Sequence, residues 1–529
     1  MEFIMTDFVI QNLLTLILFS PILGMLVVLF IPGELKQLIR KATFIVSLIP
    51  LVLSIMLWVN YDPTIVGFQF EEQAQWYTAI NSSYHVGVDG ISVPMILLTT
   101  VLVPIGVLAS FNVEDRVKSY MLLFLMLETG MLGVFMALDL IVFFVFWEIG
   151  LVPMYLLINI WGSAKGEREF SSGKKVPARQ YASYKFFVYT LAGSLGLLLA
   201  VQILGIVAGS FDLVTLLEIW PQFDKDIFAN FSINSVRTVA FWAFVIAFAI
   251  KVPLWPFHTW LPDAHTEAPT AGSMILAGVL LKLGAYGFLR LVLPLFPAEA
   301  QAAAPILAFL AMLAIVLGAL SAYGQTDFKR LVAYSSVNHM GFVVLGIAAA
   351  AMVIGNDDPA LRLSGTIATT GVVLQMFNHG ISAAAMFFLV GVVYDRAHTR
   401  NLDELGGGIW QLAPVYGGIL IFSSMASLGL PGLSGFVSEF AIVRGSWPIF
   451  SAMTALSMIG LFFTGAYILK AIRYVLHGPI NNRWVDHNME MSFREKVIVA
   501  PLIILMLIVG VWPWWITFMI NETVKTLIG

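Results

Sequence analysis

The chain has 529 residues and a formal net charge of -4, and 59% of its residues are hydrophobic while only 11% are charged. Because an ordinary soluble domain carries about 25% charged residues, this composition predicts an all-α polytopic membrane protein. No cysteine occurs, which excludes disulfides, thiolate metal sites and iron–sulfur clusters on this chain.

Apolar stretches long enough to cross a bilayer, about 20 residues each, predict fourteen transmembrane helices. In chain order they lie near residues 8–31, 43–60, 92–111, 119–137, 139–160, 184–208, 237–262, 270–293, 303–323, 329–352, 365–394, 412–444, 449–475 and 496–520. Glu2 and Asp7 precede the first stretch in place of lysines, and no small-residue cleavage site follows. We therefore expect a retained helix rather than a signal peptide.

Short loops on one face carry most of the basic residues. If the N-terminus lies outside, 20 of the 28 Lys and Arg residues fall on the inner face and six on the outer face. Lys251 and Lys282 then remain inside the membrane. The excess of positive charge on inner loops predicts that both termini lie on the outer face. The polar loop 162–179 is the one long inner linker, and nothing in it indicates a separate soluble domain.

Two stretches are interrupted by helix-breaking residues, "KVPLWP" at 251–256 and "GLPGLSG" at 429–435. Each interruption lies about five spans into one of two successive blocks of five. Broken helices at corresponding positions of two halves are typical of transporters with inverted repeats and an ion site at mid-membrane. We predict four segments, which are N-terminal helices in 1–118, a first five-helix repeat in 119–293, a second in 294–475, and a last helix in 476–529.

Six titratable side chains project to a similar depth, one on each of six predicted helices: Glu148, Lys251, Lys282, His339, His379 and Glu439. A charge at the bilayer centre costs at least about 2.5–3.5 kcal/mol, so each should face a partner or water. Burial disfavours the charged form and an opposite charge restores it, so a lysine whose acidic partner can move is a switchable proton carrier. Histidine relays protons near neutral pH. The six residues therefore predict a proton pathway.

Other readings of these polar residues stay open. Static ion pairs are the alternative for the lysines and glutamates, and helix–helix hydrogen bonds for the histidines. Glu128 is a further candidate for burial, whereas Asp139 is expected in a short outer turn. Asp327, Lys329 and Arg330 begin a helix at the inner face, where a solvated cap is the expected role.

Three further chemistries deserve a test against the spacing. His258, Asp263, His265 and Glu267 could be metal ligands, but their spacing matches no standard zinc motif, so a polar helix-break loop is favoured. "GLSG", with Ser434, is a pattern of some intramembrane hydrolases, yet four residues of this kind arise by chance in a chain with 43 glycines. No glycine-rich phosphate loop is present, which argues against nucleotide binding.

Five segments together resemble the antiporter-like family shared by respiratory complex I and the multisubunit sodium/proton antiporters. They are "HVGVDGISVPMILLTT", "FFVFWEIGLVPMYLLI", "KVPLWPFHTWLPDAHTEAPT", "DFKRLVAYSSVNHMGF" and "GLPGLSGFVSEF". The resemblance places Glu148 at the family's helix-5 glutamate, Lys251 at its helix-7 lysine and Lys282 at its helix-8 lysine. The helix-12 residue is usually lysine in the L and N types and in the antiporter D subunit, and glutamate in the M type. Glu439 therefore makes the chain similar to the M type.

The resemblance implies a proton-translocating membrane subunit of the NADH:quinone oxidoreductase enzyme, coupling quinone reduction to pumping, with discontinuous helices 7 and 12. It implies no cofactor or metal on this chain, with flavin, iron–sulfur clusters and quinone on partner subunits. The expected partners are other membrane subunits of complex I, including neighbouring antiporter-like subunits, and the lipid bilayer, with no nucleic acid. The expected location is a bacterial inner membrane rather than a thylakoid or mitochondrial one. The alternatives are a multisubunit sodium/proton antiporter and, more remotely, an intramembrane hydrolase.

Overall fold

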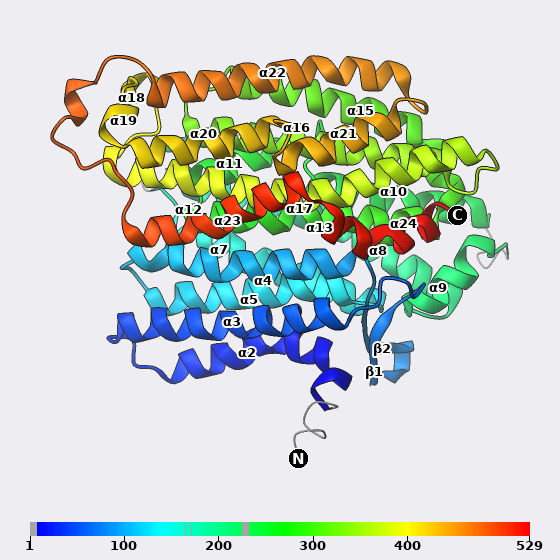
Figure 1. The fold of residues 1–529 in the computed structure, drawn as a ribbon. Coiled ribbons are helices and arrows are strands. Elements are labelled where there is room, and N and C mark those ends of the chain that lie inside the picture. The colour runs from blue at the N-terminus through cyan, green and yellow to red at the C-terminus, as the bar shows by residue number, and fades with distance from the viewer. Residues whose placement is uncertain (1–7, 164, 171, 225–231) are drawn as a thin grey trace.

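The computed structural model describes residues 8–163, 165–170, 172–224 and 232–529. Its helices run between the same two ends of the molecule and form a continuous bundle, as Figure 1 shows. The predicted all-α fold is thereby confirmed. Glu2 and Asp7, from which a retained first helix was predicted, lie outside the described residues.

Most of the described chain is helical. The helices of the first half are α2 (Leu13–Phe30), α3 (Lys36–Asn60), α4 (Ser92–Ala109), α5 (Val117–Met136), α6 (Leu140–Ile149), α7 (Leu151–Trp161), α8 (Ala178–Ala208), α9 (Leu213–Ile219), α10 (Ile233–Lys251) and α11 (Trp260–Glu267). One continuous helical segment then comprises α12 (Thr270–Ile275), the π-helical turn η4 (Leu276–Leu280), α13 (Leu281–Gly287), the π-helical turn η5 (Phe288–Val292) and α14 (Leu293–Leu295).

The second half continues with longer helices. They are α15 (Pro297–Tyr323), α16 (Phe328–Val353), α17 (Pro359–Ala397), α18 (Leu402–Leu405), α19 (Ile409–Leu412), α20 (Pro414–Leu428), α21 (Ser434–Ser446), α22 (Ser451–Leu476), α23 (Phe493–Val511) and α24 (Trp514–Ile528). Two small hairpins complete the fold, β1 (Gln69–Tyr77) with β2 (Ser82–Val88), and β3 (Glu167–Glu169) with β4 (Lys175–Pro177).

The number of membrane spans is close to the prediction. Within the described ranges, twelve helices are long and apolar enough to cross a membrane, or thirteen if the bent pair α23 and α24 is one span. The predicted span 412–444 is divided into α20 and α21, so the count of fourteen stays a prediction. The predicted span 496–520 is bent by 66° between α23 and α24. Pro513 explains the bend, because it disfavours helical geometry at Trp512, whose ψ is 73°.

Both predicted helix breaks are present in the structure. α10 ends at Lys251 and helix resumes only at α11, across a segment in which Pro253 and Pro256 donate no backbone hydrogen bond. α20 ends before Gly429, and α21 begins after Gly432. The two glycines have φ of +84° and +92°, a conformation that disfavours side chains. Whether the flanking five-helix blocks are inverted repeats, and the division into four segments, stay predictions.

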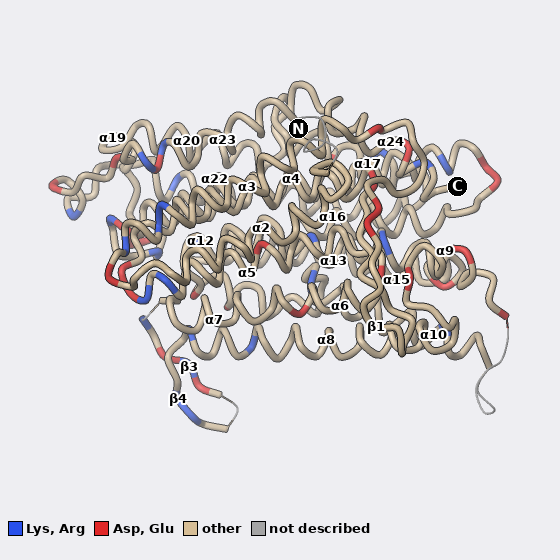
Figure 2. Tube along the Cα trace, turned by 90° about the horizontal axis from the view of Figure 1, so that it is seen from below, with Lys and Arg blue, Asp and Glu red and all other residues tan. Residues whose placement is uncertain are grey.

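Charged residues gather towards the two ends of the bundle. Many of the lysines and arginines lie at the end that carries β3, β4 and α19, and a few blue segments lie inside the bundle beside α13 (Figure 2). The asymmetry agrees with the uneven count in the sequence, although the face to which each end belongs stays a prediction. The predicted loop 162–179 contains the β3–β4 hairpin.

The β1–β2 hairpin at the opposite end is fastened by carboxylates. Nδ1 of His85 lies 2.6 Å from Asp212, and its Nε2 lies 3.1 Å from Glu71. Asp139 occupies the turn predicted for it, and its side chain is buried. It caps α6 and accepts hydrogen bonds from the hydroxyl of Ser82 and from the backbone amide of Ser83. The hairpin is therefore bound to the helical body through charged contacts.

Candidate proton-transfer site

Lys282 is the centre of a buried polar cluster. It lies on α13 directly after the π-helical turn η4, and its side chain is 0% exposed. Its ammonium group donates to the carbonyl of Ala277, five residues earlier, and lies 2.8 Å from Nδ1 of His379 on α17. π-helical turns shift backbone hydrogen bonds and often occur at functional sites. Here the turn gives a buried amine a backbone partner and a histidine partner.

Two glycines bring these helices together. A Cβ added at Gly380 would lie 2.9 Å from the carbonyl oxygen of Gly278 and 2.7 Å from Leu98 Cδ2. A Cβ at Gly278 would lie 2.6 Å from Leu102 and 3.5 Å from the carbonyl oxygen of Gly380. Small residues allow helix backbones to approach closely in membranes. This contact holds η4 against α17 next to the Lys282–His379 pair.

The second half contributes an acid and a second histidine. Nδ1 of His339, on α16, lies 2.7 Å from Oε1 of Glu439, on α21 directly after the helix break. Gln375 Nε2 donates to the same carboxylate oxygen at 3.0 Å. Nε2 of His339 lies 3.1 Å from the hydroxyl of Ser427 on α20. The structure therefore places Glu439 beside His339, and its depth in the membrane stays a prediction.

The two halves meet where Lys282 contacts His379, and His339 lies next to His379. The ring centroids of His339 and His379 are 5.6 Å apart. Lys282, His379, His339 and Glu439 thus form one row of buried titratable groups, which we call the central row. The sequence predicted each member from its depth alone, and the structure brings the four together although they lie on four separate helices.

Lys251 and Glu148 lie beside this row without a direct contact. Lys251, the last residue of α10, is buried, and its ammonium nitrogen lies 4.9 Å from the ring centroid of Trp147. Glu148 acts on it electrostatically, but among the described residues no ion pair joins the two side chains. Oε1 of Glu148 is buried without a hydrogen-bond partner in that part of the chain. A Cβ at Gly284 would lie 3.0 Å from Lys251 Cβ, so Lys251 packs directly against α13.

His265 is a buried residue whose relation to this site was not predicted from the sequence. It lies on α11, fully buried, and its ring stacks on Phe387 with centroids 4.3 Å apart. Neither ring nitrogen has a hydrogen-bond partner within the described ranges, and the charges of Lys282 and Lys329 both act on it. Sequence reasoning considered it only as a metal ligand or loop residue. The restart of the helix after Pro256 is the signal that could have placed it inside the membrane.

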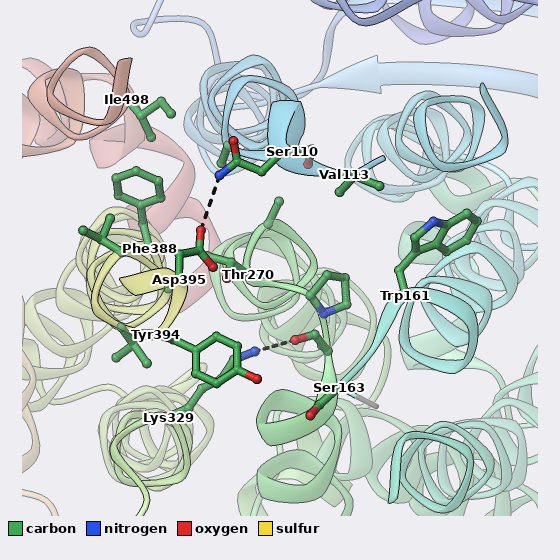
Figure 3. A pocket seen from close by; sticks show the side chains of 18 of the residues that line it. Ser110, Val113, Trp161, Ser163, Thr270, Lys329, Phe388, Tyr394, Asp395 and Ile498 are labelled. Atoms are coloured by element: carbon green, nitrogen blue, oxygen red, sulfur yellow. Dashed lines mark hydrogen bonds between the residues drawn. The ribbon is translucent and has the colours of Figure 1, made fainter. Parts of the chain in front are cut away.

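A cavity of about 260 Å³ opens beside α11, α16 and α17. Glu267, Lys329, Asp395 and Arg400 are among its lining residues, and Figure 3 shows Lys329 and Asp395 on two neighbouring helices beside it. The solvated role predicted for Lys329 is wrong, because its side chain is 5% exposed and its amine donates to the carbonyl of Ala268. Asp327 caps α16 as predicted, because its side chain accepts a hydrogen bond of 3.0 Å from the backbone amide of Arg330.

The alternative chemistries find little geometric support. Asp263 forms ion pairs with Lys185 at 2.7 Å and Arg330 at 3.6 Å, and the described ranges hold no group of three side chains arranged for a metal. Ser434 is buried, and its hydroxyl has no hydrogen-bond partner among the described residues. An activated serine needs a base within hydrogen-bond reach, so the arrangement does not resemble a hydrolase site.

Glu128 is an isolated buried acid. It lies in the middle of α5, is fully buried as expected, and neither carboxylate oxygen has a hydrogen-bond partner in the described part of the chain. Burying an ionised carboxylate without a partner is very costly. We therefore expect this side chain to be the neutral acid.

Comparisons with known proteins identify relatives over the whole length. The family model described as "NADH:quinone oxidoreductase/Mrp antiporter, TM" matches residues 137–466. The chain is 40% identical to NADH-quinone oxidoreductase subunit M of Rhodobacter capsulatus, covering 98% of this chain and 96% of that protein.

Solved structures give the same picture. A chain of respiratory complex I from Thermus thermophilus with bound NADH superimposes with a TM-score of 0.82 at 27% identity, covering 98% of this chain and all of that one. A chain of the Mrp complex from Dietzia sp. superimposes with a TM-score of 0.76 at 21% identity, covering 99% of this chain and 52% of that one. At 21% identity, the similarity to the Mrp chain supports a shared fold and nothing more.

Proposed function

The chain belongs to the NADH:quinone oxidoreductase/Mrp antiporter transmembrane family, and from this premise we propose that it is the M-type, proton-translocating subunit of an NADH:quinone oxidoreductase. It is an integral multi-pass membrane protein and a subunit of a multisubunit oxidoreductase complex. The identity of 40% to a subunit M, over nearly the full length of both chains, favours this assignment over an Mrp antiporter, since the Mrp chain from Dietzia sp. is 21% identical.

The observation that carries the proposal is the central row. A row of titratable groups within hydrogen-bond or ring contact, between two broken helices, is the arrangement needed to pass protons across the middle of a membrane. Protons are taken up from the inner face through the cavity beside Lys329, reach Lys282 by way of His265, pass along the two histidines, and leave outward near Glu439. Histidine suits the middle positions because it binds and releases protons near neutral pH.

Lys251 is the charge-switching residue in this proposal. When Glu148 is close, its carboxylate stabilises protonated Lys251, and when the two separate, burial favours release of the proton. The absence of a direct ion pair between them within the described residues, together with the unpaired Oε1 of Glu148, is compatible with a separated arrangement. Quinone reduction in partner subunits supplies the energy that changes the distance.

The remaining parts of the enzyme lie on other chains in this proposal. Flavin, iron–sulfur clusters and quinone are held by partner subunits, and neighbouring antiporter-like subunits contact this one within a bacterial inner membrane. Both termini face outward. Copurification in mild detergent tests this placement, since flavin and iron–sulfur subunits should accompany the chain. Sodium-dependent transport without NADH oxidation would instead favour the Mrp-type alternative.

Proton pumping by membrane vesicles tests the mechanism. Lys251→Ala or Glu148→Ala in an assembled complex should reduce the number of protons pumped for each NADH oxidised. Pumping at the parental ratio in both variants would overturn the assignment of these residues. A hydrolase function would require that Ser434→Ala abolish a hydrolytic activity while transport stays intact.

A further inference from the structure

One oxygen of the Glu439 carboxylate is held by two hydrogen bonds. Nδ1 of His339 lies 2.7 Å from Oε1, and Nε2 of Gln375, on α17, donates to the same oxygen at 3.0 Å. Nδ1 carries the hydrogen of its contact, because an ionised carboxylate only accepts. The other oxygen, Oε2, faces the helix break, since a Cβ built on Gly429 would lie 3.4 Å from it. One oxygen therefore faces the central row and the other faces the break.

A chain of hydrogen bonds with a single direction fixes the amide of Gln375. Nδ2 of Asn378 donates to the backbone carbonyl of Ser434 at 2.7 Å and to the hydroxyl of Ser438 at 3.1 Å. That hydroxyl in turn donates to Oε1 of Gln375. The carbonyl at one end and the carboxylate of Glu439 at the other only accept, so an amide nitrogen must face each of them. Both ends of the chain thus require that Gln375 present its N–H to Glu439.

The chain orients the carboxylate without carrying protons itself. The side chains of Gln375, Asn378 and Ser438 are all buried, and a carboxamide does not titrate. The two helices that carry the chain are also packed independently of it. A Cβ on Gly371, one turn before Gln375 on α17, would lie 2.7 Å from the amide nitrogen of Ile442 on α21. An apolar side chain of similar size at position 375 should therefore leave the two helices together.

We propose that Gln375 is a positioning residue that acts as a protonation-dependent latch on Glu439. The proposal rests on the proposed function, because it takes the central row to carry protons. While Glu439 is ionised, Gln375 holds Oε1 against His339, ready to accept a proton. The held carboxylate cannot turn, so it does not carry protons from the break back to His339.

The transfer itself opens the latch. The Nδ1–H bond of protonated His339 breaks, an O–H bond forms on Oε1 of Glu439, and an imidazolium and a carboxylate become two neutral groups. Hydrogen bonds to an ionised acceptor are roughly twice as strong as neutral ones, so the contact with Gln375 weakens at this step. The neutral acid then turns about its Cγ–Cδ bond and presents its O–H to the break. It releases the proton there, and the carboxylate returns to Gln375.

A purely structural link between α17 and α21 is the competing explanation. Such a link predicts that removing the Gln375 amide weakens the assembly, and that any proton leak is independent of Glu439. A latch predicts a passive leak that requires a titratable group at position 439, because a free carboxyl group would carry protons between the break and His339. Passive conductance, measured without NADH, separates the two explanations.

The experiment uses the whole complex in proteoliposomes with an internal pH dye and an imposed potassium diffusion potential. Gln375→Met keeps most of the side-chain volume and removes a hydrogen bond to a charged group, so it should raise proton influx on the order of tenfold. Adding Glu439→Gln should return influx to the parental level. Gln325→Met is the matched control and should stay as tight as the parent, because Nε2 of Gln325 donates to the carbonyl of Ser321 at 2.8 Å, outside the central row.

Two results would overturn the latch. One is an assembled Gln375→Met complex that leaks no more than the parent, and the other is a leak that persists after Glu439→Gln is added. If Gln375→Met fails to assemble, Ser438→Ala is the second test, because it leaves the Gln375 amide in place but free to turn. Ser438→Ala should leak less than Gln375→Met and more than the parent, and a tight Ser438→Ala complex would then be equally contrary.

Failure of the latch is distinguishable from failure of the proposed function. Lys282→Met, assayed with NADH, tests the function, and a parental number of protons for each NADH oxidised would refute the central row whatever Gln375→Met does. Reduced pumping in Lys282→Met together with a tight Gln375→Met complex would refute the latch alone.

Discussion

Replacing Gly380 with alanine should separate the two helices that hold Lys282 and His379 together. The added methyl group would lie 2.9 Å from the carbonyl oxygen of Gly278, whereas ordinary van der Waals contact begins at 3.4 Å. Leu98 also lies in the way, but its side chain can rotate. The carbonyl belongs to the backbone, so the helices must part by about 0.5 Å in a closely packed interior.

This displacement is large compared with the tolerance of the hydrogen bond next to it. Nζ of Lys282 and Nδ1 of His379 are 2.8 Å apart, so the same shift along their line would open them to about 3.3 Å, past the usual range of about 2.7–3.2 Å. Overpacking of this kind also costs about 1–3 kcal/mol of stability. We expect Gly380→Ala to assemble less stably and to pump fewer protons for each NADH oxidised.

The assay measures the number of protons pumped for each NADH oxidised, using assembled complexes purified on the same native gel. Gly418→Ala on α20 is the matched control, because a Cβ there meets nothing within 4 Å, and it should behave as the parent. Adding Leu98→Ala to Gly380→Ala should not restore pumping, since the carbonyl contact remains. A parental ratio in assembled Gly380→Ala would refute the requirement for the Lys282–His379 contact.

Three further outcomes are expected. Glu439→Gln keeps the size of the side chain but removes the charge 2.7 Å from His339, so the proton-to-NADH ratio should fall in assembled complexes, and an unchanged ratio would exclude Glu439 from the row. Glu128→Gln should leave assembly and pumping unchanged, because both side chains are neutral there, and lost pumping would mean that Glu128 titrates. Burial lowers the pKa of His85 but its two carboxylate partners raise it more, to a net value above 6.5. Their stabilisation is complete below the unfolded pKa of 6.5 and is lost as pH rises through the raised folded value. Hydrogen-exchange protection of the β1–β2 amides, corrected for intrinsic rates, should therefore decline with rising pH in the parent and stay flat in His85→Gln.

The breaks and the depth of the charged residues could be read from the sequence because both depend on local properties. Pro253 cannot donate a helical hydrogen bond wherever it stands, and Gly429 tolerates a positive φ that other residues avoid. Counting residues along an apolar stretch fixes depth, so Lys282 and His339 were found without knowledge of their neighbours.

Contacts between distant segments could not be found in this way. The burial of Lys329 depends on α16 packing against the end of α11, which places the carbonyl of Ala268 beside its amine. No residue type marks the π-helical turn before Lys282, and nothing local indicates that Arg290 pairs with Asp89 about 200 residues earlier. Helix packing decides each of these.

The proton-to-NADH ratio of the Lys282→Met complex tests the central claim most directly. Methionine keeps much of the volume of lysine and removes its proton site in the middle of the central row. Lys470→Met is the matched control, because the Lys470 amine donates to the carbonyls of Tyr323 and Gln325 at the end of α22 and lies outside the row. The account predicts a reduced ratio for Lys282→Met and a parental ratio for Lys470→Met. A parental ratio in assembled Lys282→Met complexes would contradict it.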